Sequence, residues 1–129
     1  MITIAAIALG AFIGAPLRAL AEQYASRTRS ALTSLLIINS LGSLLAGFSL
    51  GALSGDVQTF LITGFAGAFT TFSGWTLALS MFSRNLIESG VSPSARFARM
   101  GFVIVVAIGI PVLSLWLGWL FSEFLFVKN

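Results

Sequence analysis

The chain has 129 residues, of which 57% are hydrophobic and only 9% are charged, and its mean hydropathy is +1.01. A soluble domain carries about 25% charged residues, so this composition indicates an integral membrane protein. The chain has no cysteine and no histidine, which excludes disulfides, thiolate metal sites, Cys or His nucleophiles and His general bases. The net charge of +3 comes from basic residues between apolar segments, which indicates topology determinants and no nucleic-acid surface.

Four apolar segments predict an all-α membrane protein that forms one domain over residues 1–129. The spans are expected at about 2–21, 32–53, 57–82 and 97–121. The first span contains Gly10 and Gly14, whose four-residue spacing is typical of a face for close helix contact. Its apolar run ends at Arg18, which on its own indicates an interfacial arginine that reaches lipid phosphates.

The second span has one strongly polar residue, Asn39. Ser43, Gly47 and Gly51 follow it at four-residue steps, so these positions share one helical face. An asparagine within a membrane helix is costly unless its amide is hydrogen-bonded. The amide therefore either bonds to a neighbouring helix or points its N–H groups at an anion in a narrow pore.

The third expected span has an unusual centre. It reads Gly64-Phe65-Ala66-Gly67-Ala68-Phe69-Thr70-Thr71-Phe72-Ser73-Gly74-Trp75. Small and hydroxyl residues at the midpoint of a membrane helix either let another helix approach closely or let the helix break. A break at this depth frees backbone groups that lipid cannot satisfy, and it is tolerated where those groups bind an ion or line a cavity. Both interpretations stay open on composition.

This central stretch resembles the signature of the Fluc/CrcB fluoride channels, G-F-x-G-G-x-T-T-F-S-T-F. Seven of the twelve positions agree in order and spacing: Gly64, Phe65, Gly67, Thr70, Thr71, Phe72 and Ser73. The departures are Ala68, Gly74 and Trp75. Residues 38–42, Ile-Asn-Ser-Leu-Gly, are similar to a V-N-x-x-G motif of the family, and Gly10, Gly14 and Arg18 reproduce its G-x-x-x-G-x-x-x-R pattern. The fourth span is similar by hydropathy alone.

The resemblance implies a fluoride-selective channel of the cell membrane, with no enzymatic activity, that exports F⁻ passively and so reduces fluoride toxicity. The implied pore residues are Arg18, Asn39, Thr71, Phe72, Ser73 and Trp75. It also implies an antiparallel dimer of this chain with itself or with a homologous subunit, and a third helix broken at its centre. A structural Na⁺ would lie at the dimer centre, held by the backbone carbonyls of Gly67 and Thr70.

The chemistry of fluoride agrees with these residue types. The ion holds its water strongly, so a pore must offer donors in place of that water. Available donors are the Asn39 amide, the Thr71 and Ser73 hydroxyls, and the backbone amides at a break. Aromatic ring edges also carry a partial positive charge. Phe72 and Trp75 are three residues apart, a spacing that predicts two rings on one helical face.

Two other functions would also suit a small membrane protein of this size. A small multidrug exporter also has four helices, but it needs a carboxylate within the membrane. The acidic residues all lie at span ends or in loops: Glu22, Asp56, Glu88 and Glu123. That hypothesis is therefore rejected. The alternative that stays open is a non-conducting structural subunit of a dimeric membrane channel, because Ser114 is the one hydroxyl residue of the fourth span.

The basic residues predict one orientation in the membrane. Those that flank the first and third loops are Arg18, Arg27, Arg29, Arg84, Arg96 and Arg99, whereas the other side has Lys128. Lys and Arg in short loops stay cytoplasmic, so both termini are expected outside. An antiparallel homodimer needs a chain that inserts both ways with a bias near zero. The observed bias therefore predicts a homologous partner of opposite bias.

Overall fold

The computed structural model describes residues 1–26 and 30–126, and in this part of the chain every regular element is helical. The elements are α1 (Ile2–Ser26), α2 (Ala31–Ala52), α3 (Gly55–Thr59), the π-helix η1 (Phe60–Ala66), α4 (Gly67–Phe69), α5 (Ser73–Glu88) and α6 (Pro93–Phe126). The predicted all-α class is confirmed. Helices α1, α2 and α6 are long and apolar enough to cross a membrane, so the chain is a multi-pass membrane protein.

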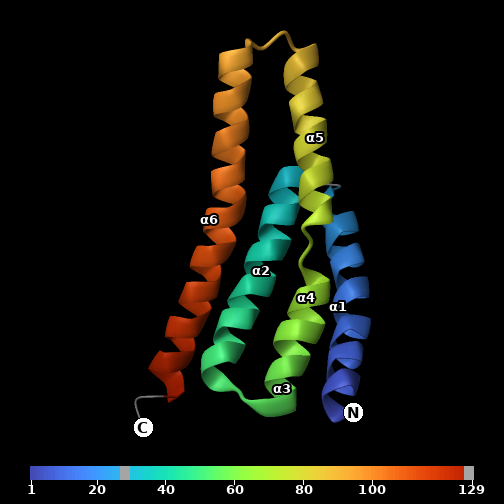
Figure 1. Ribbon diagram of the computed structural model, residues 1–129, viewed down its shortest axis with the longest axis vertical. Helices are drawn as coiled ribbons and strands as arrows, with labels where there is room; N and C mark the ends of the chain where they lie inside the picture. The colour runs from blue at the N-terminus through green and yellow to red at the C-terminus, as the bar shows by residue number, and fades with distance from the viewer. Residues whose placement is uncertain (27–29, 127–129) are drawn as a thin grey trace.

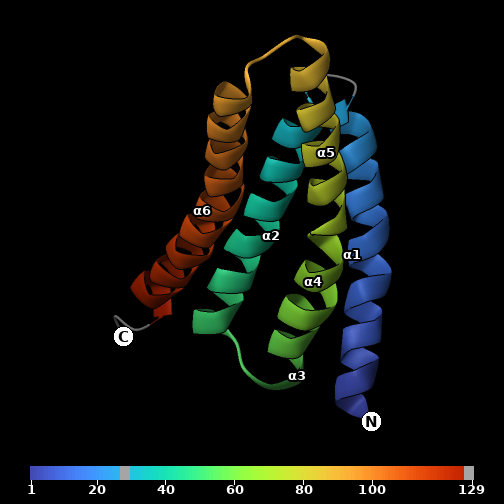
Figure 2. The same ribbon diagram turned by 45° about the horizontal axis from the view of Figure 1, so that its top comes forward.

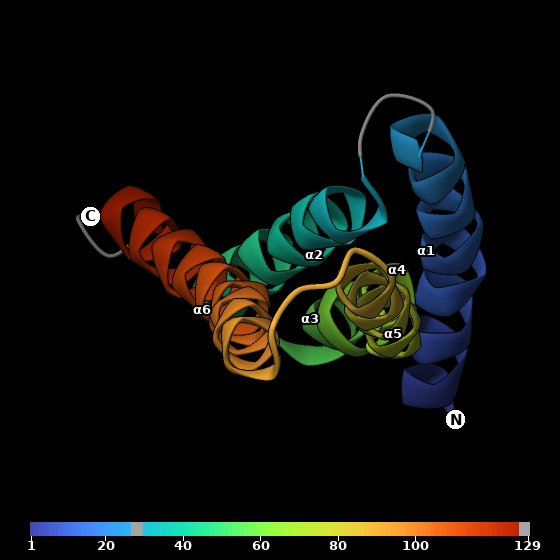
Figure 3. The same ribbon diagram turned by 90° about the horizontal axis from the view of Figure 1, so that it is seen from above.

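The third expected span is a series of short helices in place of one long helix. Figures 1 and 2 show α3, α4 and α5 following one another in a single direction beside α1. Seen from above, α3, α4 and α5 project onto one another next to α1 (Figure 3). The start of α1 and the end of α6 lie at one end of the molecule, and the α5–α6 connection lies at the other end (Figure 1).

Two glycines bring α1 against the backbone of η1. A Cβ added at Gly10 would lie 2.7 Å from the amide nitrogen of Phe65, and one added at Gly14 would lie 3.2 Å from the Phe65 Cα. Gly64 makes the same contact from the other side, since its Cβ would lie 3.0 Å from the Gly10 Cα. The predicted close-contact face of the first helix is therefore confirmed, and Gly64 serves the same contact.

Helix α2 packs tightly against the second half of α6. A Cβ added at Gly47 would lie 3.0 Å from the Leu115 Cα, and one added at Gly118 would lie 2.8 Å from the Phe48 amide nitrogen. In the first half of α6, by contrast, a Cβ at Gly101 would meet no atom within 4 Å. Helix α6 therefore contacts α2 closely through its second half.

Polar contacts fix the start of the third segment. Gly55 has a φ of +64°, which a turn between α2 and α3 requires and which glycine adopts without strain. Gln58 Nε2 donates to the Leu53 carbonyl at 2.9 Å and so closes the end of α2. Thr3 Oγ1 donates to Asp56 Oδ1 at 3.0 Å, which ties the start of α1 to α3.

The structure describes only some of the basic residues that indicate an orientation in the membrane. Arg27, Arg29 and Lys128 lie outside the described residues. Arg84 lies in the second half of α5 and Arg96 in the first turns of α6, both toward the α5–α6 connection. The orientation inferred from charge therefore stays a prediction.

Candidate functional site

The backbone leaves helical geometry between α4 and α5. Helix α4 ends at Phe69, Thr70 is extended with φ −79° and ψ 159°, and α5 begins at Ser73. The preceding π-helix is a form often found at functional sites. Gly64 and Gly67, which the sequence analysis associated with a break, both lie in helical turns. Gly64 is instead occupied by its contact with α1.

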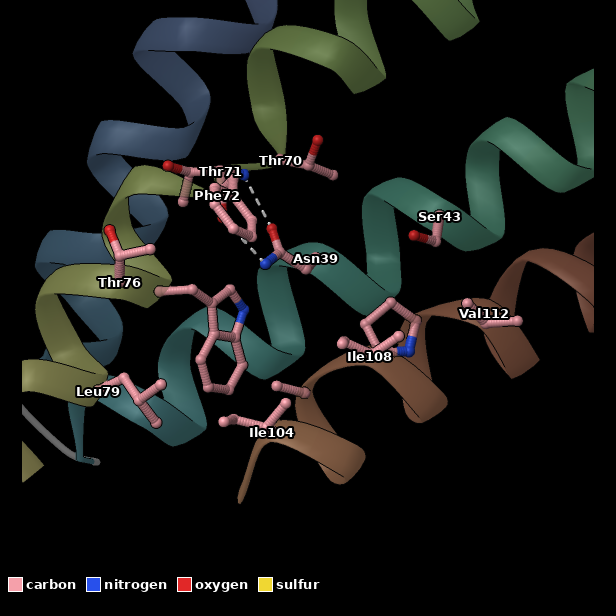
Figure 4. A pocket seen from close by; sticks show the side chains of 13 residues that line it. Asn39, Ser43, Thr70, Thr71, Phe72, Thr76, Leu79, Ile104, Ile108 and Val112 are labelled. Atoms are coloured by element: carbon pink, nitrogen blue, oxygen red, sulfur yellow. Dashed lines mark hydrogen bonds between the residues drawn. The ribbon is translucent and has the colours of Figure 1, made fainter. Parts of the chain in front are cut away.

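Residues 70–72 form an interruption between α4 and α5. Asn39 of α2 is paired with the backbone of this interruption. The Thr71 amide donates to Asn39 Oδ1 at 2.9 Å, and Asn39 Nδ2 donates to the Thr71 carbonyl at 3.2 Å (Figure 4). Both residues are buried, at 8% and 9% exposed. An unsatisfied buried backbone group costs about 1–3 kcal/mol, so the pair removes a large penalty. One N–H of the Asn39 amide is left for other partners.

The Thr71 side chain begins α5. Its Oγ1 accepts from the Gly74 amide at 3.1 Å, as a helix N-cap does, and lies 3.2 Å from Ser73 Oγ. A Cβ added at Gly74 would lie 2.9 Å from Thr71 Cγ2 and 3.0 Å from Leu35 Cδ2. Glycine at this position, where the family signature has a threonine, therefore suits a tight contact between α2 and α5.

A cavity of about 550 Å³ lies beside the interruption, between α2, α5 and α6 (Figure 4). Its lining residues are Asn39, Ser43, Thr70, Thr71, Phe72, Trp75, Thr76, Leu79, Ile104, Ala107, Ile108, Pro111 and Val112. The polar residues come from α2, the interruption and α5. The wall from α6 is apolar, and none of the lining residues is charged.

The structure brings four of the six expected pore residues to this cavity: Asn39, Thr71, Phe72 and Trp75. Ser73 does not line it but touches the Thr71 hydroxyl. Arg18 is also absent from the lining; on α1 it forms an ion pair with Glu22 at 3.6 Å.

The expected aromatic pair, Phe72 and Trp75, lies at the start of α5. Phe72 immediately precedes α5 with helical backbone angles, φ −89° and ψ −38°, and its carbonyl accepts from the Thr76 amide at 3.1 Å. Phe72 and Trp75 both line the cavity, and Phe72 is 83% exposed. The parallel stacked pair is Phe65 and Phe69, with ring centroids 5.6 Å apart and an interplanar angle of 11°. Their four-residue spacing is the signal that could have found them. The Trp75 indole nitrogen is buried and has no hydrogen-bond partner.

Two carbonyls of the interruption lose their helical donors. In a continuous α-helix the Gly67 carbonyl would accept from the Thr71 amide, and the Thr70 carbonyl from the Gly74 amide. Those amides donate instead to Asn39 Oδ1 and Thr71 Oγ1. Within the described residues no cluster of three Asp, Glu, His or Cys side chains could hold a metal. The freed carbonyl oxygens fit Na⁺, which such unwound backbone binds in membrane proteins.

Comparisons with known proteins agree with these features. The family described as "CrcB-like protein, Camphor Resistance (CrcB)" matches residues 5–119. A Methanococcus maripaludis protein named "Fluoride-specific ion channel FluC" is 44% identical over 72 residues, which cover 52% of this chain and 59% of that protein. "Fluoride-specific ion channel FluC 1" of Geobacillus kaustophilus is 47% identical over 70 residues, covering 52% and 60%. A Thermus thermophilus protein named "Fluoride-specific ion channel FluC" is 37% identical over 92 residues, covering 67% and 64%.

Membrane-length helices around an uncharged polar interruption define a multi-pass membrane protein. The chain belongs to the CrcB family, since the family match extends over residues 5–119. The matched part spans 59% and 60% of the length of the first two curated relatives.

Proposed function

We propose that this chain is a subunit of a fluoride-selective channel that lets F⁻ leave the cytoplasm passively and so reduces its toxicity. The observation that carries the proposal is the uncharged polar surface where α4 gives way to α5, bordering a cavity of about 550 Å³. The relatives named as fluoride-specific ion channels support it.

The donors at this surface suit a small anion. The first amides of a helix have no intrahelical partner and carry the positive end of the helix dipole, and α5 begins beside the cavity. The free N–H of Asn39, the hydroxyls of Thr71 and Ser73, and the Phe72 ring edge add to them. No fixed cation lines the cavity, so a bound anion can also leave, as conduction requires.

Arg18 takes a different part in this proposal. It is separate from the cavity lining and its side chain is 34% exposed, beside Glu22. A cation at the approach to a pore raises the local concentration of anions without trapping them inside. Arg18 would therefore form a positive vestibule, and the pore itself would begin beyond it.

The assembly is part of the same proposal. Helices α3 to α5 together form one membrane span with a break at its centre, so the chain has four spans. Two antiparallel subunits close the pores between them, and the partner is either a second copy or a homologous subunit of opposite charge bias. A structural Na⁺ lies at the dimer centre on the carbonyls of Gly67 and Thr70, whose helical donors are bound elsewhere.

The alternative is a non-conducting structural subunit of a dimeric channel. One observation favours it: the α6 wall of the cavity consists of Ile104, Ala107, Ile108, Pro111 and Val112, and so offers no hydroxyl to a passing ion. Such a subunit would support a partner's pore while its own pore carried nothing.

Growth of bacteria that lack their own fluoride exporter tests the function. Expression of this chain alone should restore growth in fluoride and lower the fluoride content of the cells, with an empty vector as the control. If the chain restores growth only together with a homologous subunit, the structural alternative or a strict heterodimer is favoured. If neither combination does, the fluoride proposal is wrong.

A further inference from the structure

We infer that Asn39 is a positioning residue of the channel: its side-chain amide replaces the peptide partners that Thr71 loses at the interruption and so fixes the conducting geometry. The inference rests on the proposed function only for its effect on fluoride flux. The positioning itself can be measured without any ion.

The two hydrogen bonds pair groups that match in kind. A side-chain amide has one carbonyl acceptor and N–H donors, as a peptide group has. The Thr71 N–H meets the Asn39 acceptor at 2.9 Å, and the Thr71 carbonyl meets the Asn39 donor at 3.2 Å. Both residues are buried, so a group left unpaired at either position would be costly. A hydroxyl side chain could satisfy one of these groups well, whereas an amide supplies both partners in one plane.

Both sides of the interruption depend on this pair. Because Asn39 holds the Thr71 amide, the Gly67 carbonyl is left without its helical donor. Once Thr71 is fixed, its hydroxyl accepts from the Gly74 amide and sets the start of α5. The amide that the sequence analysis read as a pore donor is therefore mostly engaged with backbone, with one N–H left over.

The substitution Asn39→Asp tests the pairing with almost no change of shape. A carboxylate still accepts from the Thr71 amide, but its second oxygen faces the Thr71 carbonyl oxygen, and two acceptors repel each other. A protonated carboxyl supplies one O–H donor and one carbonyl acceptor, so it restores both bonds. None of the 13 residues that line the cavity is titratable, so the introduced carboxyl titrates without a charged neighbour in the lining.

Hydrogen exchange at the Thr71 amide measures the positioning directly. The chain in lipid nanodiscs would be compared with Asn39→Ala and with Ser43→Ala. Ser43 lines the same cavity from α2 and makes no hydrogen bond to the interruption, so it is the matched control. We expect exchange at Thr71 to rise at least about tenfold in Asn39→Ala and to stay unchanged in Ser43→Ala. Unchanged exchange in Asn39→Ala would overturn the inference.

Fluoride efflux from liposomes then tests the consequence. Asn39→Asp should carry little fluoride near neutral pH and recover as the pH falls to about 5, because burial favours the neutral carboxyl. Asn39→Ala should not recover, and leak from protein-free liposomes is subtracted at each pH. If wild type conducts at low pH and Asn39→Asp does not recover, the inference is wrong. If wild type itself carries no fluoride, the proposed function fails, and the exchange comparison still decides the positioning.

Discussion

Replacing Thr71 by Val removes one hydroxyl and keeps the shape of the side chain. That hydroxyl accepts from the Gly74 amide at 3.1 Å and caps α5 in the interior of the molecule. Loss of a helix N-cap costs typically about 1 kcal/mol, which is a factor of about five in the equilibrium between ordered and frayed helix start. Hydrogen exchange of the first amides of α5 should therefore rise about fivefold in Thr71→Val. Thr71→Ser, which keeps the oxygen, should leave exchange unchanged.

The same variant separates two roles of the hydroxyl. Fraying of the first turn alone leaves α5 ordered most of the time, so cap loss should lower fluoride flux less than about twofold. A hydrogen bond to a charged group is worth about 1.5–3 kcal/mol, so loss of a direct fluoride donor should lower flux more than about tenfold. We expect the larger loss, because Thr71 lines the cavity. Thr76→Val is the control, since Thr76 lines the same cavity but donates to its own helix at Ser73. Wild-type exchange in Thr71→Val would refute the capping argument.

Three further predictions follow from individual residues. Trp75→Phe removes a buried indole N–H that has no partner, and such a group costs about 1–3 kcal/mol. The variant should therefore be at least as stable in detergent as wild type and should carry more fluoride. A destabilised variant would contradict this prediction. A Cβ at Gly67 meets only the Ile62 carbonyl, at 3.6 Å, so the Gly67→Val chain should fold normally. It should nevertheless lose the dimer and the response of the dimer to Na⁺. A dimer of wild-type stability in gel filtration would count against the proposed sodium site. Single cysteines at Ser89, beside the α5–α6 connection, and at Ser54, beside the α2–α3 connection, should be labelled from opposite sides of the membrane in cells, with Ser89 cytoplasmic; equal labelling of each from both sides would indicate dual insertion.

Hydropathy and glycine spacing predict much of this fold. The all-α class follows from the apolar segments, and the close approach of α1 follows from Gly10 and Gly14, whose missing side chains are visible in the sequence. The observed α1 and α6 extend beyond the expected spans, to Ser26 and from Pro93 to Phe126. A hydropathy pattern locates the apolar part of a helix, so it does not show how far the polar ends of that helix continue.

The details of the interruption could not be read from the sequence. Small residues serve both close packing and backbone breaks, and here Gly64 serves packing while the chain breaks at Thr70. The partner of Asn39 lies 32 residues along the chain and is a backbone group, so no side-chain pattern marks it. Membership of Asn39 and Thr71 in one site was predicted through the family motif, whereas their pairing needed the structure.

Fluoride efflux from liposomes that contain the purified chain tests the central claim most directly, with chloride as the comparison and no energy source present. Downhill fluoride efflux should far exceed that from protein-free liposomes, and chloride efflux should stay at the level of the leak. Fluoride efflux no faster than the leak, from the chain alone and from the chain paired with a homologous subunit, would contradict the account. Equal efflux of fluoride and chloride would contradict its selectivity.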